Sequence, residues 1–244
     1  MSRSDRARPG KRLCALTLAV SLLLLAAVGV GCSSKPKGTS STSSSSATSP
    51  TGTSPVTKPP TSTVPLVLSG TGTTNTDAFT LTAGLAVFQV VYSGGANCQA
   101  SLLDASGKTV SVLYNLNRNT TGSTALGVTA GRYSISTTAT GSWQINVVQQ
   151  IPVSPQFIPV FTNGIGPLVT PFFQSNGGNA TVTMTYAGTA PFVVTLLTSS
   201  GSVVSTVANA STGPFNGTQT VFLRQNVIYL IDVEGDGSWT LTVQ

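Results

Sequence analysis

The chain has 244 residues, of which 40% are hydrophobic and only 7% are charged, and it contains no histidine. This length permits two small domains, and the lack of histidine removes the side chain that most often serves in acid–base catalysis and metal binding. The formal net charge of +6 would suit a nucleic-acid partner only if the cations were clustered in a folded domain.

The positive charge lies outside the part of the chain that is expected to fold. Residues 1–31 have a net charge of +4 and residues 32–64 a net charge of +3, whereas residues 65–244 have a net charge of −1. Nucleic-acid binding requires clustered Lys and Arg side chains that neutralise phosphates. The sequence therefore predicts no nucleic-acid partner.

Residues 1–31 have the organisation of an export signal. Basic residues near the start are followed by an apolar run over 13–31, which ends in small residues. A charged first part, an apolar second part and small residues at the end are typical of signal peptides. Because the basic end stays on the inner side, we expect the rest of the chain outside the cytoplasmic membrane.

The apolar run stops at Val30-Gly31-Cys32, directly before the sequence becomes polar. This arrangement resembles the lipobox of bacterial lipoproteins, with Gly29 in place of the usual larger aliphatic residue. The resemblance implies lipidation of Cys32 and a lipid anchor in the membrane, at the cell surface or in the periplasm. Two alternatives stay open: the apolar run could span the bilayer as an uncleaved anchor, or cleavage by another peptidase could secrete the domains.

Residues 32–64 are expected to form a disordered tether. Ser, Thr and Pro occupy 24 of the 32 positions over 33–64, so this segment has little apolar surface with which to form a core. A flexible coil of this length spans roughly 30 Å. We therefore expect a stalk that holds the following domains away from a membrane.

Residues 65–244 contain two copies of one sequence pattern. Residues 92–103 align with 186–197 at an offset of 94, and Gly141-Ser142-Trp143 aligns with residues 237–239 at an offset of 96. Cys98 falls opposite Phe192, which predicts a small buried side chain there. The copies are predicted as domains over 65–148 and 161–244, joined by a Pro-rich connector over 149–160.

Both copies are predicted to be all-β, because apolar and polar side chains alternate as in 181–186. Strand-like runs separated by Gly, Asn and Ser recur about every ten residues. In the first copy these runs cover 66–69, 77–82, 85–92, 98–104, 108–114, 123–128, 131–138 and 142–148. This spacing predicts two tandem β-sandwich domains of a jelly-roll-like kind.

One pattern in the first copy resembles small extracytoplasmic β-sandwich modules of bacterial lipoproteins and secreted proteins. It runs from Ala130-Gly131-Arg132-Tyr133-x-Ile135 to Gly141-Ser142-Trp143-x-Ile145-x-Val147. The general build of 65–244 is also similar to bacterial pre-peptidase C-terminal domains. The resemblance rests on core and turn positions, and it implies an accessory or binding role without naming a ligand.

Three of the five acidic residues of 65–244 lie close together in Asp232-Val-Glu234-Gly-Asp236. Alternation places Asp232 and Glu234 on one face of a strand, with Asp236 in the turn that follows. Carboxylate oxygens beside a glycine turn suit calcium, so a calcium site is one hypothesis. The alternative is a solvated outer face, since the residues between them are apolar and belong to the inner face.

The aromatic residues divide into two groups. Trp143 and Trp239 begin strands whose alternate residues are apolar, so both are predicted in the cores. Tyr114, Phe172 and Phe215 are less constrained by the pattern and are the aromatic candidates for an exposed ligand-binding surface.

The chain is predicted not to be an enzyme. It has no nucleophile elbow, phosphate-binding loop or Ser–His pair, and neighbouring acids on one strand do not provide the two carboxylates across a cleft that glycosidases need. The leading hypothesis is a surface-anchored, non-catalytic binding or adhesion module at the cell envelope, with a glycan or envelope protein as partner. The alternative is a structural spacer or a partner subunit of an envelope complex.

Overall fold

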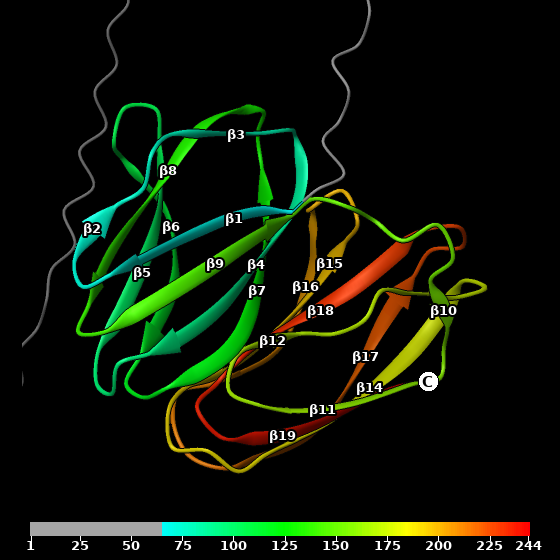
Figure 1. The fold of residues 1–244 in the computed structure, drawn as a ribbon. Coiled ribbons are helices and arrows are strands. Elements are labelled where there is room, and N and C mark those ends of the chain that lie inside the picture. The colour runs from blue at the N-terminus through cyan, green and yellow to red at the C-terminus, as the bar shows by residue number, and fades with distance from the viewer. Residues whose placement is uncertain (1–64) are drawn as a thin grey trace, which may run out of the picture. The chain divides into compact units, whose positions relative to one another are not determined.

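A computed structural model describes residues 65–244 (Figure 1). The predictions for the signal peptide over 1–31, for Cys32 and for the tether over 32–64 lie outside the described residues. Within 65–244 no helix is long and apolar enough to cross a membrane.

The first copy folds as a sandwich of two antiparallel sheets. One sheet has the strand order β1-β9-β4-β7, and the other has the order β2-β8-β5-β6, with β3 also paired to β8. The strands are β1 (Leu66–Thr71), β2 (Thr74–Asn75), β3 (Phe79–Leu81), β4 (Gly84–Ser93), β5 (Cys98–Asp104), β6 (Thr109–Leu116), β7 (Thr120–Val128), β8 (Gly131–Ala139) and β9 (Ser142–Val148).

The second copy repeats this topology strand for strand. One sheet has the order β11-β19-β14-β17, and the other has the order β10-β13-β18-β15-β16, with β12 also paired to β18. The strands are β10 (Gln156–Phe157), β11 (Val160–Ile165), β12 (Leu168–Val169), β13 (Phe173–Gln174), β14 (Gly178–Tyr186), β15 (Phe192–Thr198), β16 (Val203–Ala210), β17 (Phe215–Leu223), β18 (Ile228–Glu234) and β19 (Ser238–Val243).

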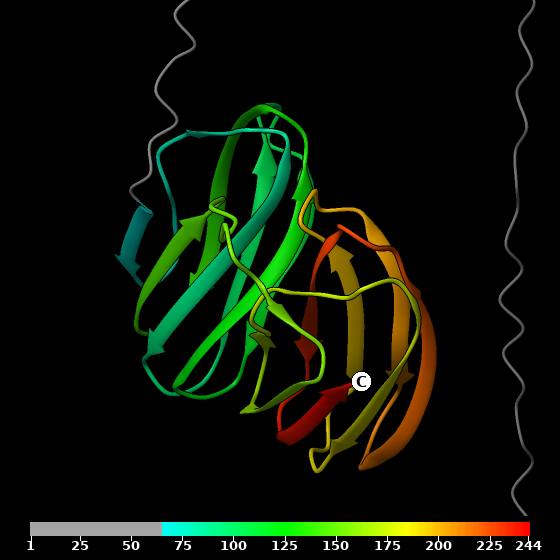
Figure 2. The same cartoon turned by 90° about the vertical axis from the view of Figure 1, so that its right-hand side faces the viewer.

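In both copies the first and last long strands are neighbours in one sheet, and the chain alternates between two facing sheets (Figure 2). This is the jelly-roll arrangement. The prediction of an all-β chain with two tandem jelly-roll-like sandwiches is confirmed for the described residues. The connector adds the short strand β10, which pairs in parallel with β13, and β11 begins at Val160, inside the range expected for the connector.

The cross-strand register shows that the copies are equivalent in detail. Tyr92 pairs with Trp143 in the first sandwich, as Tyr186 pairs with Trp239 in the second. All four rings are buried, so the core prediction for both tryptophans is confirmed. Cys98 and its counterpart Phe192 are also buried in their cores, as predicted, and burial raises the pKa of the Cys98 thiol.

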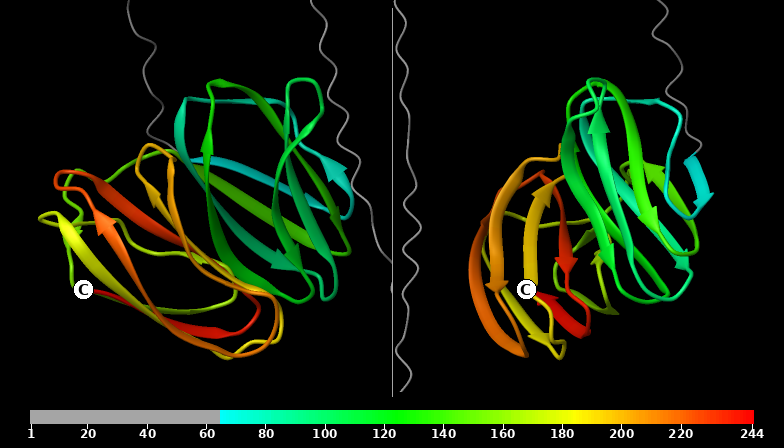
Figure 3. Two further views of the ribbon diagram at one scale, coloured as in Figure 1. Left: turned by 180° about the vertical axis from the view of Figure 1, so that it is seen from behind. Right: turned by 90° about the vertical axis from the view of Figure 1, so that its left-hand side faces the viewer.

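The two sandwiches pack together into one compact unit. Strand β7 lies beside β12 and β18 of the second sandwich (Figure 3). Leu85 and Ala125 of the first sandwich form a small apolar cluster with Leu197 and Leu230 of the second. Polar contacts flank this cluster: the Val169 amide donates to Ser123 Oγ at 2.8 Å, and the Ser123 amide donates to the Pro167 carbonyl at 3.1 Å.

Candidate functional site

Asp232 lies in the contact between the two sandwiches. Its side chain is only 5% exposed, and its Oδ2 accepts a hydrogen bond of 2.9 Å from Thr124 Oγ1 of the first sandwich. Burial raises the pKa of Asp232 to about 7, and the nearby Glu234 carboxylate adds to this shift. The prediction of a solvated outer face is therefore wrong at Asp232, because the first sandwich covers this part of β18.

Asp236 lies in the turn between β18 and β19, and its side chain binds the loop between β14 and β15. Its carboxylate accepts hydrogen bonds from the Tyr186 hydroxyl, from the amides of Thr189 and Ala190 at 2.9 and 3.0 Å, and from Thr189 Oγ1 at 2.8 Å. These donors stabilise the charged carboxylate and hold the pKa of Asp236 below its usual value, and the Tyr186 hydroxyl has the largest effect. Asp236 thus fastens the loop to the end of the sandwich.

The third carboxylate, Glu234, is exposed at the end of β18. No group of three His, Cys, Asp or Glu side chains within residues 65–244 is arranged to bind a metal ion. Asp232 and Asp236 bind protein groups instead, so their positions lend the calcium hypothesis no support, and calcium binding stays a prediction.

The three aromatic candidates do not form an exposed surface. Tyr114 is only 2% exposed, and its hydroxyl donates to the Phe88 carbonyl inside the first sandwich. Phe172 is half-buried against the apolar cluster between the sandwiches, and Phe215 is half-buried against the second core, 5.7 Å from the ring of Phe192. The prediction of exposure is wrong for Tyr114, because β6 turns this side chain inward.

The structure assembles a broad exposed surface on the outer face of the sheet β11-β19-β14-β17. Because side chains alternate along a strand, every second residue of these four strands points away from the core. We call this surface the threonine face. It comprises Phe161, Asn163 and Ile165 from β11, Ser238, Thr240 and Thr242 from β19, Asn179, Thr181, Thr183 and Thr185 from β14, and Asn216, Thr218, Thr220 and Phe222 from β17.

The threonine face forms rows that run across the strands. One row is Asn163, Thr240, Thr185 and Asn216, and the next is Phe161, Thr242, Thr183 and Thr218. Neighbouring side chains in a row are about 4.8 Å apart and the rows are about 6.7 Å apart, as the geometry of a sheet requires. Hydroxyls of neighbouring strands interact, at 2.6 Å between Thr185 and Thr240 and at 3.4 Å between Thr183 and Thr218.

A hollow of about 400 Å³ opens on this face where β19 passes between β11 and β14. Its polar lining includes Asn163, Thr185, Ser238 and Thr240, and Ile165 supplies an apolar wall. Its remaining lining residues are Gly164, Tyr186, Ala187 and Trp239. The hollow therefore combines hydrogen-bonding groups with an apolar side.

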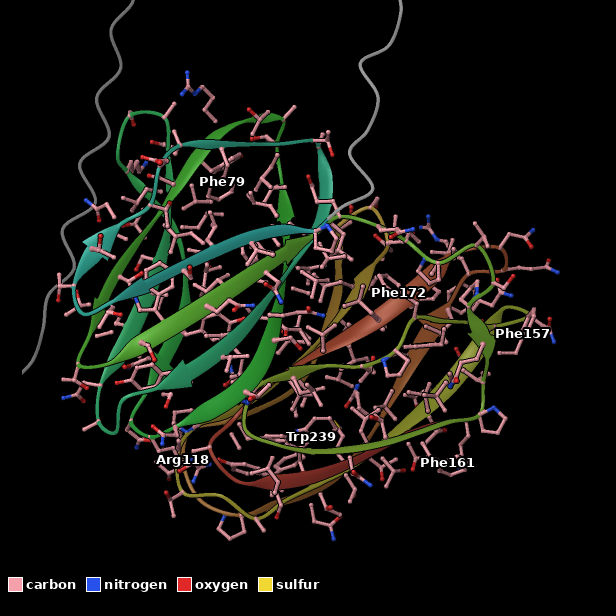
Figure 4. The ribbon with its side chains drawn as sticks, viewed as in Figure 1. Phe79, Arg118, Phe157, Phe161, Phe172 and Trp239 are labelled. Atoms are coloured by element: carbon pink, nitrogen blue, oxygen red, sulfur yellow. The ribbon has the colours of Figure 1, made fainter. Side chains whose placement is uncertain are left out.

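Three large apolar side chains stand at the borders of the threonine face. Phe161 and Ile165, on the edge strand β11, are 72% and 69% exposed, and Phe222, on the opposite edge strand, is 63% exposed. Figure 4 shows Phe161 beside β11, whereas Trp239 points into the sandwich. Only the strand order brings these four strands side by side.

The corresponding face of the first sandwich is different. Val67 stands where the second sandwich has Phe161, Ser69 where it has Asn163, and Gln144 where it has Thr240. On strand β7 of this face Ser123 and Ala125 are buried, and the second sandwich packs against them. A broad and open face of this kind is therefore a property of the second sandwich.

Comparisons with known proteins give only weak structural similarities. No protein-family model matches the chain, and no curated protein matches it. Among solved structures it is similar to a Clostridium perfringens protein with an M60 catalytic domain and two CBM51 domains, at 6% identity, 73% coverage of this chain, 34% of that chain and a TM-score of 0.28.

Two further solved structures are similar at the same low level. One is an isomaltodextranase from Arthrobacter globiformis in complex with panose, at 12% identity, 68% coverage of this chain, 35% of that chain and a TM-score of 0.24. The other is a cupin 2 conserved barrel domain protein from Leptotrichia buccalis, at 12% identity, 73% coverage of this chain, 88% of that chain and a TM-score of 0.21. The chain spans about a third of the length of the first two proteins.

Proposed function

We propose that this protein is a non-catalytic binding or adhesion module of a bacterial cell envelope, and that the threonine face of the second sandwich contacts its partner. The observation that supports this proposal most directly is the composition of the face. Eleven of its fourteen side chains are Thr, Asn or Ser, and the other three are exposed Phe or Ile. Hydroxyls and amides can donate and accept hydrogen bonds, and the exposed apolar groups at the borders of the face can cover apolar parts of the same partner.

The engagement of the acidic residues supports a binding role over catalysis. Asp232 binds Thr124 across the contact between the sandwiches, and Asp236 binds the loop over Thr189 and Ala190. General acid–base catalysis needs a titratable group within hydrogen-bonding reach of a substrate. Neither carboxylate belongs to the threonine face or lines its hollow.

The proposal includes a lipid anchor at Cys32, on the resemblance to the lipobox, followed by the Ser/Thr/Pro-rich tether. Cys32→Ser is expected to move the protein from the detergent phase to the aqueous phase in phase partitioning, or to block its processing. Unchanged partitioning would instead indicate an uncleaved membrane anchor. Presence of the native protein in the culture medium would indicate the secreted form.

The binding function is tested by co-sedimentation of the purified full-length protein with cell envelopes from the producing organism, with and without calcium. We expect saturable binding in both conditions. Absence of binding would overturn the proposal. Co-purification of one stoichiometric protein would then favour the alternative, a structural spacer or partner subunit of an envelope complex.

A further inference from the structure

The threonine face carries no charged side chain among its fourteen residues. A charged ligand would lose hydration on this face without gaining an opposite charge in return. Charged polymers such as nucleic acids and acidic polysaccharides are recognised by clustered cations, which this face does not offer. Its chemistry therefore selects an uncharged partner.

The distribution of apolar groups argues against a folded protein as that partner. Protein interfaces bury an apolar or aromatic centre surrounded by a polar rim. The threonine face has the opposite arrangement, because its centre consists of Thr side chains from β14 and β19 and its large apolar residues stand at the borders. A protein partner would find no apolar centre to bury.

The same arrangement fits a polysaccharide. A sugar ring has apolar C–H faces and a rim of hydroxyls, so it can place one face on an aromatic ring while its hydroxyls bond to Thr and Asn. Phe161 and Ile165 are four residues apart on β11, about 13 Å along the strand, with the hollow over Asn163, Thr185 and Thr240 beside them. This length exceeds a single sugar ring and suits consecutive units of one chain.

Neutral hydrogen bonds contribute little individually, because each one replaces hydrogen bonds that both groups make to water. A ligand that uses this face must therefore make many contacts over several rows of side chains. We propose, as a refinement that rests on the binding function proposed above, that the threonine face binds an extended, uncharged polysaccharide along β11 and β19. The sugar units contact Phe161 and Ile165, and their hydroxyls bond to Asn163, Thr185 and Thr240.

The first test measures retention of the purified full-length protein on four insoluble neutral polymers: amorphous cellulose, chitin, β-1,3-glucan and starch. Polygalacturonate and chitosan are the acidic and basic counterparts. We expect binding to at least one neutral polymer that is unchanged between low and high salt, because salt screens only interactions between charges. Retention by a charged polymer alone, or retention by none, would overturn the inference.

Variants of the face and of its counterpart in the first sandwich locate the binding site. Phe161→Ala and Thr240→Ala are each expected to weaken binding about tenfold, the size of losing a stacking contact or a well-placed hydrogen bond. The matched controls Val67→Ala and Gln144→Ala change the equivalent positions of the first sandwich and should leave binding unchanged. All four side chains are exposed, so the melting temperature should stay the same. Equal binding by all four variants would overturn the assignment of the site.

A second test separates this inference from the binding function itself. Envelopes of the producing organism are treated with a mixture of cellulase, chitinase, β-1,3-glucanase and amylase, or with protease, and are then used for co-sedimentation. Binding that is lost after the glycan hydrolases and kept after protease supports the inference. Binding that is lost after protease and kept after the glycan hydrolases overturns it and leaves the binding function in place, whereas no binding to untreated envelopes overturns the binding function.

Discussion

At the scale of single residues, Asp236 performs a task that a neutral side chain performs in the first sandwich. Tyr92 and Tyr186 are equivalent, and the hydroxyl of Tyr92 bonds to Thr140 Oγ1 at 2.8 Å, whereas that of Tyr186 bonds to Asp236. Both arrangements fasten the equivalent loop of their sandwich, between β4 and β5 in the first and between β14 and β15 in the second. The Asp236 carboxylate also accepts hydrogen bonds from two backbone amides. An amide forms a stronger hydrogen bond to a charged carboxylate than to a neutral hydroxyl.

Asp236→Ala is expected to lower the free energy of unfolding by about 1–2 kcal/mol, because it leaves several donors of the loop without their acceptor. Asp236→Thr, which copies the first sandwich, should cost less. The pKa of Asp236 is lowered in the folded state, so its stabilisation is complete above about pH 4 and is lost as the pH falls further. Urea unfolding at several pH values should therefore show a steeper acid loss in the wild type than in Asp236→Thr. Parallel curves would contradict this role.

Asp232 has the opposite dependence on pH. Burial raises its pKa to about 7, with a contribution from Glu234, so the folded state favours the neutral acid. As the pH rises from about 4 to about 7, the carboxyl ionises in the unfolded chain before it ionises in the folded one, and the stability falls. Above this window the contribution stays constant.

Asp232→Asn is expected to remove this loss. Relative to the wild type, the variant should gain stability between about pH 4 and pH 8 by a few kcal/mol, since each pKa unit corresponds to about 1.4 kcal/mol. The measurement is the free energy of unfolding by urea at each pH. Glu234→Gln is the control on the same strand, and it should retain most of the slope because burial, and not the Glu234 charge, is the largest cause of the raised pKa of Asp232. A slope unchanged in Asp232→Asn would contradict the assignment.

At the scale of elements, each sandwich holds its tryptophan beneath a glycine of the edge strand. Gly70 pairs directly with Trp143, and Gly164 pairs with Trp239. The indole N–H of Trp239 donates to the Gly166 carbonyl at 2.9 Å, and that of Trp143 donates to the Gly72 carbonyl at 3.4 Å. The aromatic ring thus covers the backbone of a glycine in the neighbouring edge strand.

Gly164→Ala and Gly70→Ala are each expected to destabilise their sandwich by about 1–3 kcal/mol, since the added methyl group overpacks the core. A Cβ at Gly164 would lie 2.6 Å from Cζ2 of Trp239, and one at Gly70 would lie 2.5 Å from Cζ2 of Trp143. Gly131→Ala is the control, because its Cβ would lie 3.6 Å from the nearest atom. Tryptophan fluorescence during urea unfolding reports the effect, and a variant as stable as the control would refute the packing argument.

At the scale of the whole described unit, the two sandwiches join through an apolar cluster whose equivalent positions outside the contact are mostly polar. Leu85, Ala125 and Gly127 of the first sandwich have Asn179, Thr220 and Phe222 as counterparts in the second. On the other side of the contact, Leu230 and Asp232 have Ser134 and Ser136 as counterparts in the first sandwich. Four of these five equivalent positions are therefore polar, and Phe222 is the exception.

Gly127→Leu is expected to separate the sandwiches. A Cβ at Gly127 would lie 2.2 Å from the carbonyl oxygen of Gly201, so a side chain there collides with backbone of the second sandwich. Calorimetry should then show two transitions in place of one, and small-angle scattering should show a larger radius of gyration. Phe222→Leu, at the equivalent exposed position, is the control. A single transition in Gly127→Leu would contradict this account of the contact.

Alternation along the chain was sufficient to predict the strands, because a residue's side of a strand depends only on its position in sequence. The equivalence of Cys98 with Phe192 and the burial of both tryptophans were predictable for the same reason. The threonine face was not, because its four strands come from separate parts of the second copy and become neighbours only in the jelly roll. The pattern of one strand does not say which other strands extend its outer face.

The all-β class, the two copies and most of the core side chains could be predicted from the sequence, since these follow from local periodicity and from the repeat. The burial of Asp232, the inward orientation of Tyr114 and the openness of the threonine face became visible only in the folded structure. Alternation separates the two faces of a strand but does not reveal whether a second domain covers the outer one. At Asp232 the covering group, Thr124, lies 108 residues away in the chain, where no local pattern reaches.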